Sequence, residues 1–301
     1  MLNPDQTEEF DALLPGQSAM DGANRRTALK LALGVGFAAT AMPIMAQTAI
    51  KTSSEGLTAG EATYDVNGFS VPFFYAMPTG KSNLPVILVI QEIFGVHEYI
   101  ADTCRRFAKA GYLAIAPELY ARQGDPSQYG EMAKLMSEVV SKVPDEQVVG
   151  DLDGAVKWAG GNGGNVKKVG ITGFCWGGRI TWLYCQHSKN VKAGVAWYGR
   201  LVGTASALTP KHPLELAAEL KAPVLGLYGG QDAGIPLTTI VQMKDALAAA
   251  KGNAAAQATQ FVVYKDAPHA FHADYRPSYR KDAAQDGFAK ALAWFNGHGV
   301  G

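Results

Sequence analysis

The sequence lacks several features that mark particular classes of protein. It has only three cysteines among 301 residues and no Cys-x-x-Cys pair, which argues against a disulfide scaffold and a structural zinc site. Its 27 basic and 27 acidic residues balance, so the basic excess typical of nucleic-acid binding is missing. With 48% apolar residues, the chain is instead expected to fold around a large core. We therefore expect neither a metal nor a nucleic-acid partner.

The sequence also has no apolar run of the roughly 20 residues needed to cross a bilayer. The run at residues 31–42 follows Arg25 and Arg26 and precedes Ala46, an order typical of a cleavable signal peptide. The paired arginines resemble a twin-arginine export signal. We therefore expect residues 1–46 to engage an export machinery and the protein to be periplasmic. The alternative is an amphipathic N-terminal helix.

Residues 47–301 are expected to form a single domain, because strand-like and helix-like segments alternate along them without a repeat or a linker. The expected strands lie at residues 62–66, 71–77, 86–91, 113–116, 168–174, 191–198, 223–228 and 260–264, the first two as a hairpin. The expected helices lie at residues 100–110, 129–143, 146–159, 177–186, 237–250 and 282–295. This alternation predicts an α/β fold with a doubly wound, mostly parallel sheet and sites at the carboxyl ends of its strands.

The segment from Gly173 to Gly177 carries the strongest chemical signal. It places Cys175 between a buried strand and a helix, with glycines two positions before and after it, as in a G-x-S-x-G nucleophile elbow with cysteine for serine. The start of a helix favours a thiolate at this position. A buried core cysteine is the alternative, and it is the interpretation that we adopt for Cys104 and Cys185. Three free thiols are therefore expected.

An elbow nucleophile needs an acid and then a histidine later in the chain. Asp232 follows the strand at 223–228 and fits the acid, although a turn residue is the alternative. His269 follows the strand at 260–264 and fits the base, with His272 as its rival. The four other histidines are expected to be solvated, in helices or at the surface: His97, His187, His212 and His298.

With these residues in place, the chain resembles the dienelactone hydrolase family of the α/β-hydrolase fold, whose members include the carboxymethylenebutenolidases. The resemblance is carried by residues 91–96, 117–123, 173–178 and 268–271, which follow the order of the family and span most of residues 47–301.

The resemblance implies a role for each matching residue. Cys175 would be the nucleophile, His269 the base and Asp232 the acid that orients it. Glu92 would hold the resting thiol and help to form the thiolate. The backbone N–H groups of Ile93 and Trp176 would form the oxyanion hole, and no cofactor would be needed.

The sequence departs from the family where members bind the carboxylate of their substrate. Ala273 occupies the position four residues after His269 where the family has an arginine, and no arginine lies between Gln123 and Lys142. Candidate substrate contacts are therefore drawn from Tyr120, Arg122, Arg200 and Arg276. The natural substrate and the oligomeric state stay open.

These features together predict a hydrolase that opens a lactone or cleaves an activated carboxylic ester. The reaction would use a Cys-His-Asp triad and a thioester acyl-enzyme. A thioesterase or a general carboxylesterase for a small acid is the alternative within the enzymes. A catalytically silent, thiol-bearing binding protein of the periplasm is the alternative from another class.

Overall fold

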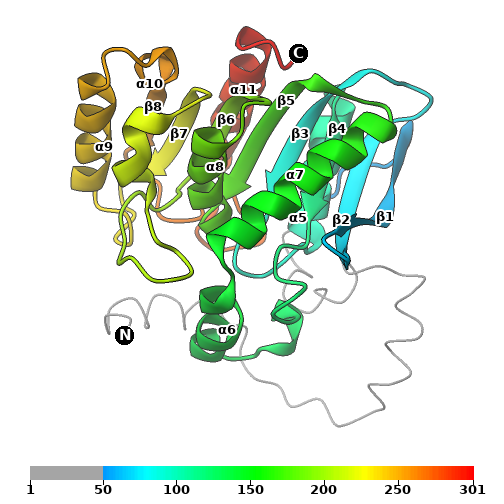
Figure 1. Ribbon diagram of the computed structural model, residues 1–301, viewed down its shortest axis with the longest axis horizontal. Coiled ribbons are helices and arrows are strands. Elements are labelled where there is room, and N and C mark those ends of the chain that lie inside the picture. The colour runs from blue at the N-terminus through cyan, green and yellow to red at the C-terminus, as the bar shows by residue number, and fades with distance from the viewer. Residues whose placement is uncertain (1–49) are drawn as a thin grey trace.

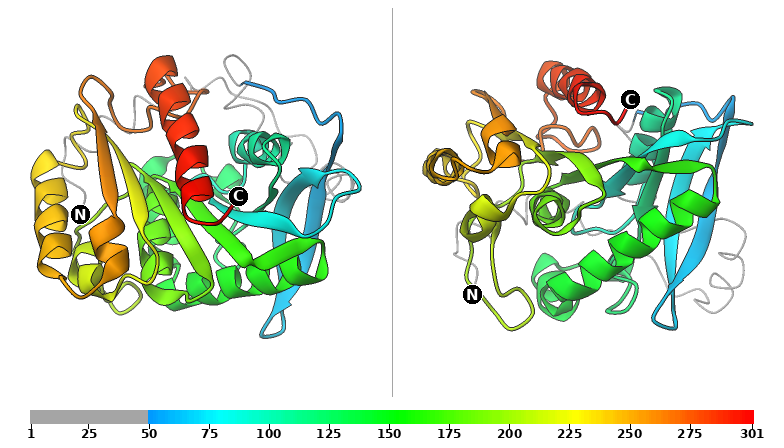
Figure 2. Two further views of the ribbon diagram at one scale, coloured as in Figure 1. Left: turned by 90° about the horizontal axis from the view of Figure 1, so that it is seen from above. Right: turned by 45° about the horizontal axis from the view of Figure 1, so that its top comes forward.

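The computed structural model describes residues 50–301, and the expected signal peptide lies outside them. These residues build one eight-stranded sheet in the order β1-β2-β4-β3-β5-β6-β7-β8 (Figures 1 and 2). Strands β1 and β2 form an antiparallel hairpin, β2 pairs antiparallel with β4, and all other neighbours are parallel. The strands are β1 Leu57–Val66, β2 Phe69–Pro78, β3 Leu84–Ile90, β4 Leu113–Pro117, β5 Gly164–Phe174, β6 Val191–Trp197, β7 Val224–Gly229 and β8 Gln260–Tyr264.

Helices cover both faces of this sheet, α5 and α11 on one and α7 and α8 on the other (Figure 2). The helices are α5 Glu98–Lys109, α6 Met132–Glu138, α7 Asp145–Gly161, α8 Trp176–His187, α9 Leu237–Ala249, α10 Ala254–Ala258 and α11 Lys281–Gly297. Three short 3-10 helices add η1 Pro126–Gln128, η2 Val140–Lys142 and η3 Pro213–Glu219. No helix within residues 50–301 is both long and apolar enough to span a membrane.

The predicted α/β architecture is confirmed, and its cause is visible in β3. Because helices lie on both faces, Val86 to Ile90 are fully buried on either side of the strand. Such a strand is a continuous apolar run rather than an alternating one. The parallel strands all end at one edge of the sheet, which collects the loops that carry the candidate site.

The helix predicted at residues 129–143 is wrong as a single element. Only α6 and the short η2 form there, and Val139 is the residue at which the first ends and the second begins. The hydroxyls of Ser137 and Ser141 bond to backbone carbonyls one turn earlier, a pattern that competes with a regular helix. Figure 1 shows α6 lying below the sheet, apart from the helices that cover its faces.

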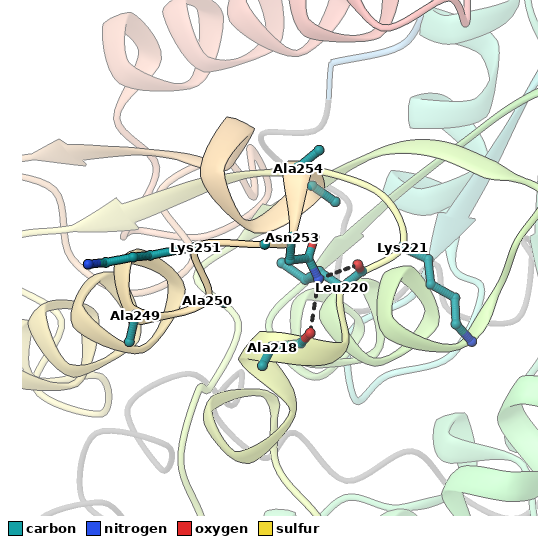
Figure 3. Close-up of a pocket in the computed structure, with 10 residues that line it drawn as sticks. Ala218, Leu220, Lys221, Ala249, Ala250, Lys251, Asn253 and Ala254 are labelled. Atoms are coloured by element: carbon teal, nitrogen blue, oxygen red, sulfur yellow. Dashed lines mark hydrogen bonds between the residues drawn. The ribbon is translucent and has the colours of Figure 1, made fainter.

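The short helix α10, which the sequence pattern did not predict, is attached to the fold by Asn253. Its side-chain amide donates hydrogen bonds to the carbonyls of Ala218 (2.9 Å) and Leu220 (2.8 Å), at the lining of a surface pocket between η3, α9 and α10 (Figure 3). Its amide oxygen accepts the N–H of Ala256 at 3.0 Å and so caps α10. Among residues 50–301, Lys221 and Lys251 are the only charged residues that line this pocket.

We predict that Asn253→Ala destabilises the protein by about 2–3 kcal/mol, because two hydrogen bonds and one helix cap are lost together. Urea unfolding at neutral pH measures this change. Asn162→Ala is the matched control, since Asn162 is exposed and its amide donates only to the Trp158 carbonyl. Equal unfolding midpoints for the two variants would contradict the proposed role of Asn253.

Candidate active site

Cys175 lies at a sharp reversal of the backbone between β5 and α8. Its φ of 55° is in the left-handed region, which non-glycine residues rarely adopt and which is concentrated at functional sites. The reversal requires the two flanking glycines. A Cβ atom on Gly173 would collide with the carbonyl of Gly177, and one on Gly177 would lie 2.5 Å from the carbonyl oxygen of Gln91. The half-buried thiol is therefore presented at the carboxyl edge of the sheet.

His269 and Asp232 meet at the same edge, as expected from their places after β8 and β7. The Nδ1 atom of His269 lies 2.6 Å from Oδ2 of Asp232. The other oxygen of Asp232 accepts the backbone N–H groups of Gly234 (3.0 Å) and Ile235 (3.1 Å), which fixes the carboxylate.

The His269 imidazole also faces the thiol of Cys175. Burial alone would lower the pKa of His269, but the adjacent sulfur and the Asp232 carboxylate outweigh burial and raise this pKa to about 10. This environment stabilises an imidazolium next to the sulfur. It therefore favours transfer of a proton from a thiol to the ring.

Glu92 is fully buried and is held by three neighbours. Its Oε2 atom accepts the hydroxyl of Tyr275 at 2.5 Å and lies 3.6 Å from Nε2 of His97, while Oε1 lies 3.7 Å from Nη2 of Arg276. Burial would raise the pKa of Glu92, but the charge of Arg276 and the bonds from His97 and Tyr275 lower it to about 2. Within residues 50–301 no hydrogen bond joins Glu92 to Cys175.

Two expectations about histidines are wrong. His97 is only 3% exposed and His212 only 7% exposed, because one packs beside Glu92 and the other accepts a hydrogen bond from Arg179. Sequence spacing gave no sign of the partners of Glu92. Its bond to Tyr275 spans 183 positions and forms only when the loop after His269 folds back on β3.

His272, the rival base, is packed inside the core. Its ring lies between Trp197 (4.3 Å between ring centres) and Phe174 (5.1 Å), and its Nδ1 is 2.5 Å from the Tyr99 hydroxyl. Burial lowers its pKa to about 3, so the ring is neutral. The structure thus pairs His269, and not His272, with Asp232.

The expected oxyanion donors lie at the start of α8 and in the turn after β3. Trp176 is the first residue of α8, so its amide has no partner within the helix. Ile93 lies in the turn that follows β3. Tyr120 is buried, and its ring packs edge-on against the indole of Trp176 with 4.9 Å between ring centres.

The three candidate arginines differ in what they contact. Arg122 is engaged by the buried Asp151 at 2.5 Å and stacks over the ring of Phe69. Arg276 is buried against Glu92 and lies over the ring of Phe94. Arg200 is exposed directly after β6 and takes part in no ion pair in residues 50–301.

Two further observations describe the chemistry of this region. All three cysteines are free, as predicted, and Cys104 and Cys185 are buried in helices. Burial raises the pKa of both of these thiols far above the ordinary value. The described residues contain no cluster of three His, Cys, Asp or Glu side chains that could hold a metal ion.

We predict that Glu92→Gln makes the free energy of unfolding depend less on pH in the acid range. The pKa of Glu92 is lowered from 4.5 to about 2, so its ionised form stabilises the fold above pH 4.5. This contribution, about 3 kcal/mol, is lost as the pH falls through 4.5 towards 2. Urea unfolding should therefore separate Glu92→Gln from the wild type at pH 6 and much less at pH 3. The exposed Glu131→Gln is the control, and a Glu92→Gln difference that is equal at both pH values would refute the prediction.

Comparisons with known proteins show which family the chain resembles. Residues 71–299 match the model of the dienelactone hydrolase family. The chain is 56% identical over 292 residues to a Methylorubrum extorquens protein named "Putative carboxymethylenebutenolidase", covering 97% of this chain and 99% of that one. It is 50% identical over 265 residues to an Escherichia coli K12 protein of the same name, covering 88% and 96% of the two chains.

A solved structure supports the same assignment. The "Putative Dienelactone Hydrolase" of Klebsiella pneumoniae superposes with a TM-score of 0.77 at 53% identity, covering 80% of this chain and 98% of that one. A carboxylic ester hydrolase activity follows from these relatives together. The chain belongs to the dienelactone hydrolase family.

Proposed function

We propose that this hydrolase opens a lactone or cleaves an activated ester through attack by Cys175 and a thioester acyl-enzyme. The observation that carries the proposal is the left-handed Cys175, whose thiol faces an imidazole held at 2.6 Å by a buried carboxylate. A nucleophile, a base beside it and a group that orients the base are the arrangement that acyl transfer needs.

In the first half-reaction, His269 takes the thiol proton and the Cys175 sulfur attacks the carbonyl carbon. The negative oxygen that forms would accept hydrogen bonds from the amides of Ile93 and Trp176, each worth about 3 kcal/mol in related sites. The tetrahedral intermediate then expels the alcohol oxygen, which receives the proton from His269. With a lactone, this alcohol stays attached to the acyl group.

In the second half-reaction, neutral His269 removes a proton from water, and the resulting hydroxide attacks the thioester. The carbon–sulfur bond breaks, and the sulfur recovers its proton from the imidazolium. Asp232 keeps the ring in one orientation throughout, because its other oxygen is tied to two backbone amides.

For Glu92 we propose an electrostatic role rather than the proton transfer that the family resemblance suggests. A carboxyl group with a pKa of about 2 is a weak base for a thiol proton. Its charge instead offsets Arg276 and holds the hydroxyl of Tyr275. Glu92→Gln is still expected to weaken activity, because it leaves Arg276 buried without its counter-charge.

The substrate contacts proposed from the sequence rank differently once their surroundings are known. Arg200 follows β6, is exposed and has no ion pair within residues 50–301, so it is the strongest of the three arginines as a candidate for an anionic group of the substrate. Tyr120 is buried and would act indirectly, because its ring packs against the apolar indole of Trp176. Arg122 is a weaker candidate because Asp151 already occupies it.

We predict that Cys175→Ala abolishes hydrolysis of p-nitrophenyl acetate, and that Cys175→Ser retains little of it because a hydroxyl stays protonated. His269→Ala should lower kcat/KM by about 100-fold or more. Asp232→Asn should have an intermediate effect, since the acid only orients the ring. Steady-state kinetics with each purified variant measure these changes.

His187→Ala is the matched control for these variants, since His187 is exposed and should leave kcat/KM unchanged. The buried His272 is unsuitable as a neutral control, because truncation would open a cavity beneath Phe174 and Trp197. If His269→Ala kept the wild-type rate, His269 would not be the base. If the wild type released p-nitrophenol no faster than Cys175→Ala, the silent binding protein would be the better description.

We also propose that the protein is exported to the periplasm by the twin-arginine machinery through its first 46 residues. N-terminal sequencing of the periplasmic protein should begin near Gln47. Replacing Arg25 and Arg26 by lysine should retain the protein in the cytoplasm, because paired arginines are the address that the machinery reads. An intact Met1 in the periplasmic fraction would argue against cleavage.

A further inference from the structure

Glu118 is a buried carboxyl group that none of the steps above uses. It follows β4, and its Oε2 atom accepts the backbone N–H of Val96 at 2.7 Å. It lies directly against Gly95, where the φ of 77° and the space favour glycine, because a Cβ atom would approach Oε2 to 2.9 Å. Glu118 therefore holds the turn after β3 through its contacts with Gly95 and Val96, and Ile93 belongs to that turn.

The same carboxyl group reaches towards the second candidate donor. Its Oε1 atom accepts the N–H of Tyr120 at 3.5 Å, and the adjacent Leu119 N–H donates to the Gln91 side chain at 3.3 Å. The ring of Tyr120 then packs against Trp176, the residue that follows Cys175. The carboxyl group of Glu118 thus contacts both the turn that contains Ile93 and Tyr120, the residue that packs against Trp176.

Glu118 has no cationic partner to explain its place in the core. None of the ion pairs formed by residues 50–301 includes it, and its neighbours are backbone amides and the Gln91 side chain. Burial raises its pKa to about 7, and the bonds from Val96 and Tyr120 oppose that rise. Burying a carboxyl group without a cation is costly, which indicates that the segments of Val96 and Tyr120 that it holds have a function.

We propose that Glu118 is a positioning residue. Its carboxyl group holds the turn that contains Ile93 and also holds Tyr120, which packs against Trp176. The backbone amides of Ile93 and Trp176 can then donate to the same substrate oxygen. The inference rests on the proposed function, because it assumes that these two amides form the oxyanion hole.

Two reactions of the same thiol separate this role from general support of the fold. Acylation of Cys175 by p-nitrophenyl acetate passes through an oxyanion and needs the two amides. Alkylation by iodoacetamide displaces iodide at a tetrahedral carbon and forms no oxyanion, but it needs the same thiolate. A change in thiolate reactivity affects both rate constants and cancels in their ratio, whereas a weakened oxyanion hole lowers the ratio.

We predict that Glu118→Ala lowers the acylation rate by about 10- to 100-fold while alkylation changes by less than about twofold. Glu118→Gln keeps one acceptor oxygen but turns an NH2 group towards an N–H donor, so it should lower the ratio by a smaller factor, about 3- to 10-fold. Both rates are measured on the intact protein by release of p-nitrophenol and by mass spectrometry of Cys175.

Asp102→Asn is the control for loss of a buried carboxylate away from the site. Asp102 pairs with Arg105 and Arg106 in α5 and should lower stability without changing the ratio. Equal losses of acylation and alkylation in Glu118→Ala would overturn the inference. A wild-type ratio of the two rates in Glu118→Gln would overturn it as well. The glutamine variant alone decides the test if the alanine variant does not fold. A wild type that is alkylated but never acylated would instead refute the proposed function.

Discussion

The candidate site is organised around the sharp backbone reversal at Cys175. A left-handed residue between a buried strand and a helix persists only if its surroundings hold it there. Glycines allow this, because a Cβ atom on Gly177 would lie 2.5 Å from the carbonyl oxygen of Gln91, just after β3. One on Gly178 would lie 2.5 Å from the carbonyl oxygen of Trp197, at the end of β6. The close approach of α8 to the sheet brings the sulfur to the edge where the loops after β7 and β8 converge.

Three buried carboxyl groups surround this edge, and each is stabilised differently. Asp232 is held by two amides and an imidazole. Glu92 is held by Arg276, His97 and Tyr275, which keep its pKa near 2. Glu118 meets only uncharged donors, and its pKa rises to about 7. The same functional group thus supplies orientation, fixed charge and backbone support, because local dielectric and hydrogen-bond donors differ at each position.

Much of the fold could be predicted because many of its strands and helices have recognisable patterns in short stretches of sequence. The run at 86–91 indicated a strand buried on both faces, and the spacing of Gly173, Cys175 and Gly177 indicated the turn after β5. Predictions failed where local preference competes with packing. Residues 129–143 have helical periodicity, yet the helix ends at Val139, and α10 depends on Asn253 bonding to residues more than 30 positions away.

The local pattern indicated the order of the candidate nucleophile, acid and histidine, since each follows a recognisable buried strand and parallel strands end at one edge. It also determined that Cys175 needs glycines on both sides. Tertiary packing accounts for the pairing of His269 with Asp232, for the burial of His97, and for the contacts of Tyr275 and Arg276 with Glu92. These contacts join positions as much as 183 residues apart. Their geometry comes from the packing of whole loops, and no local pattern encodes it.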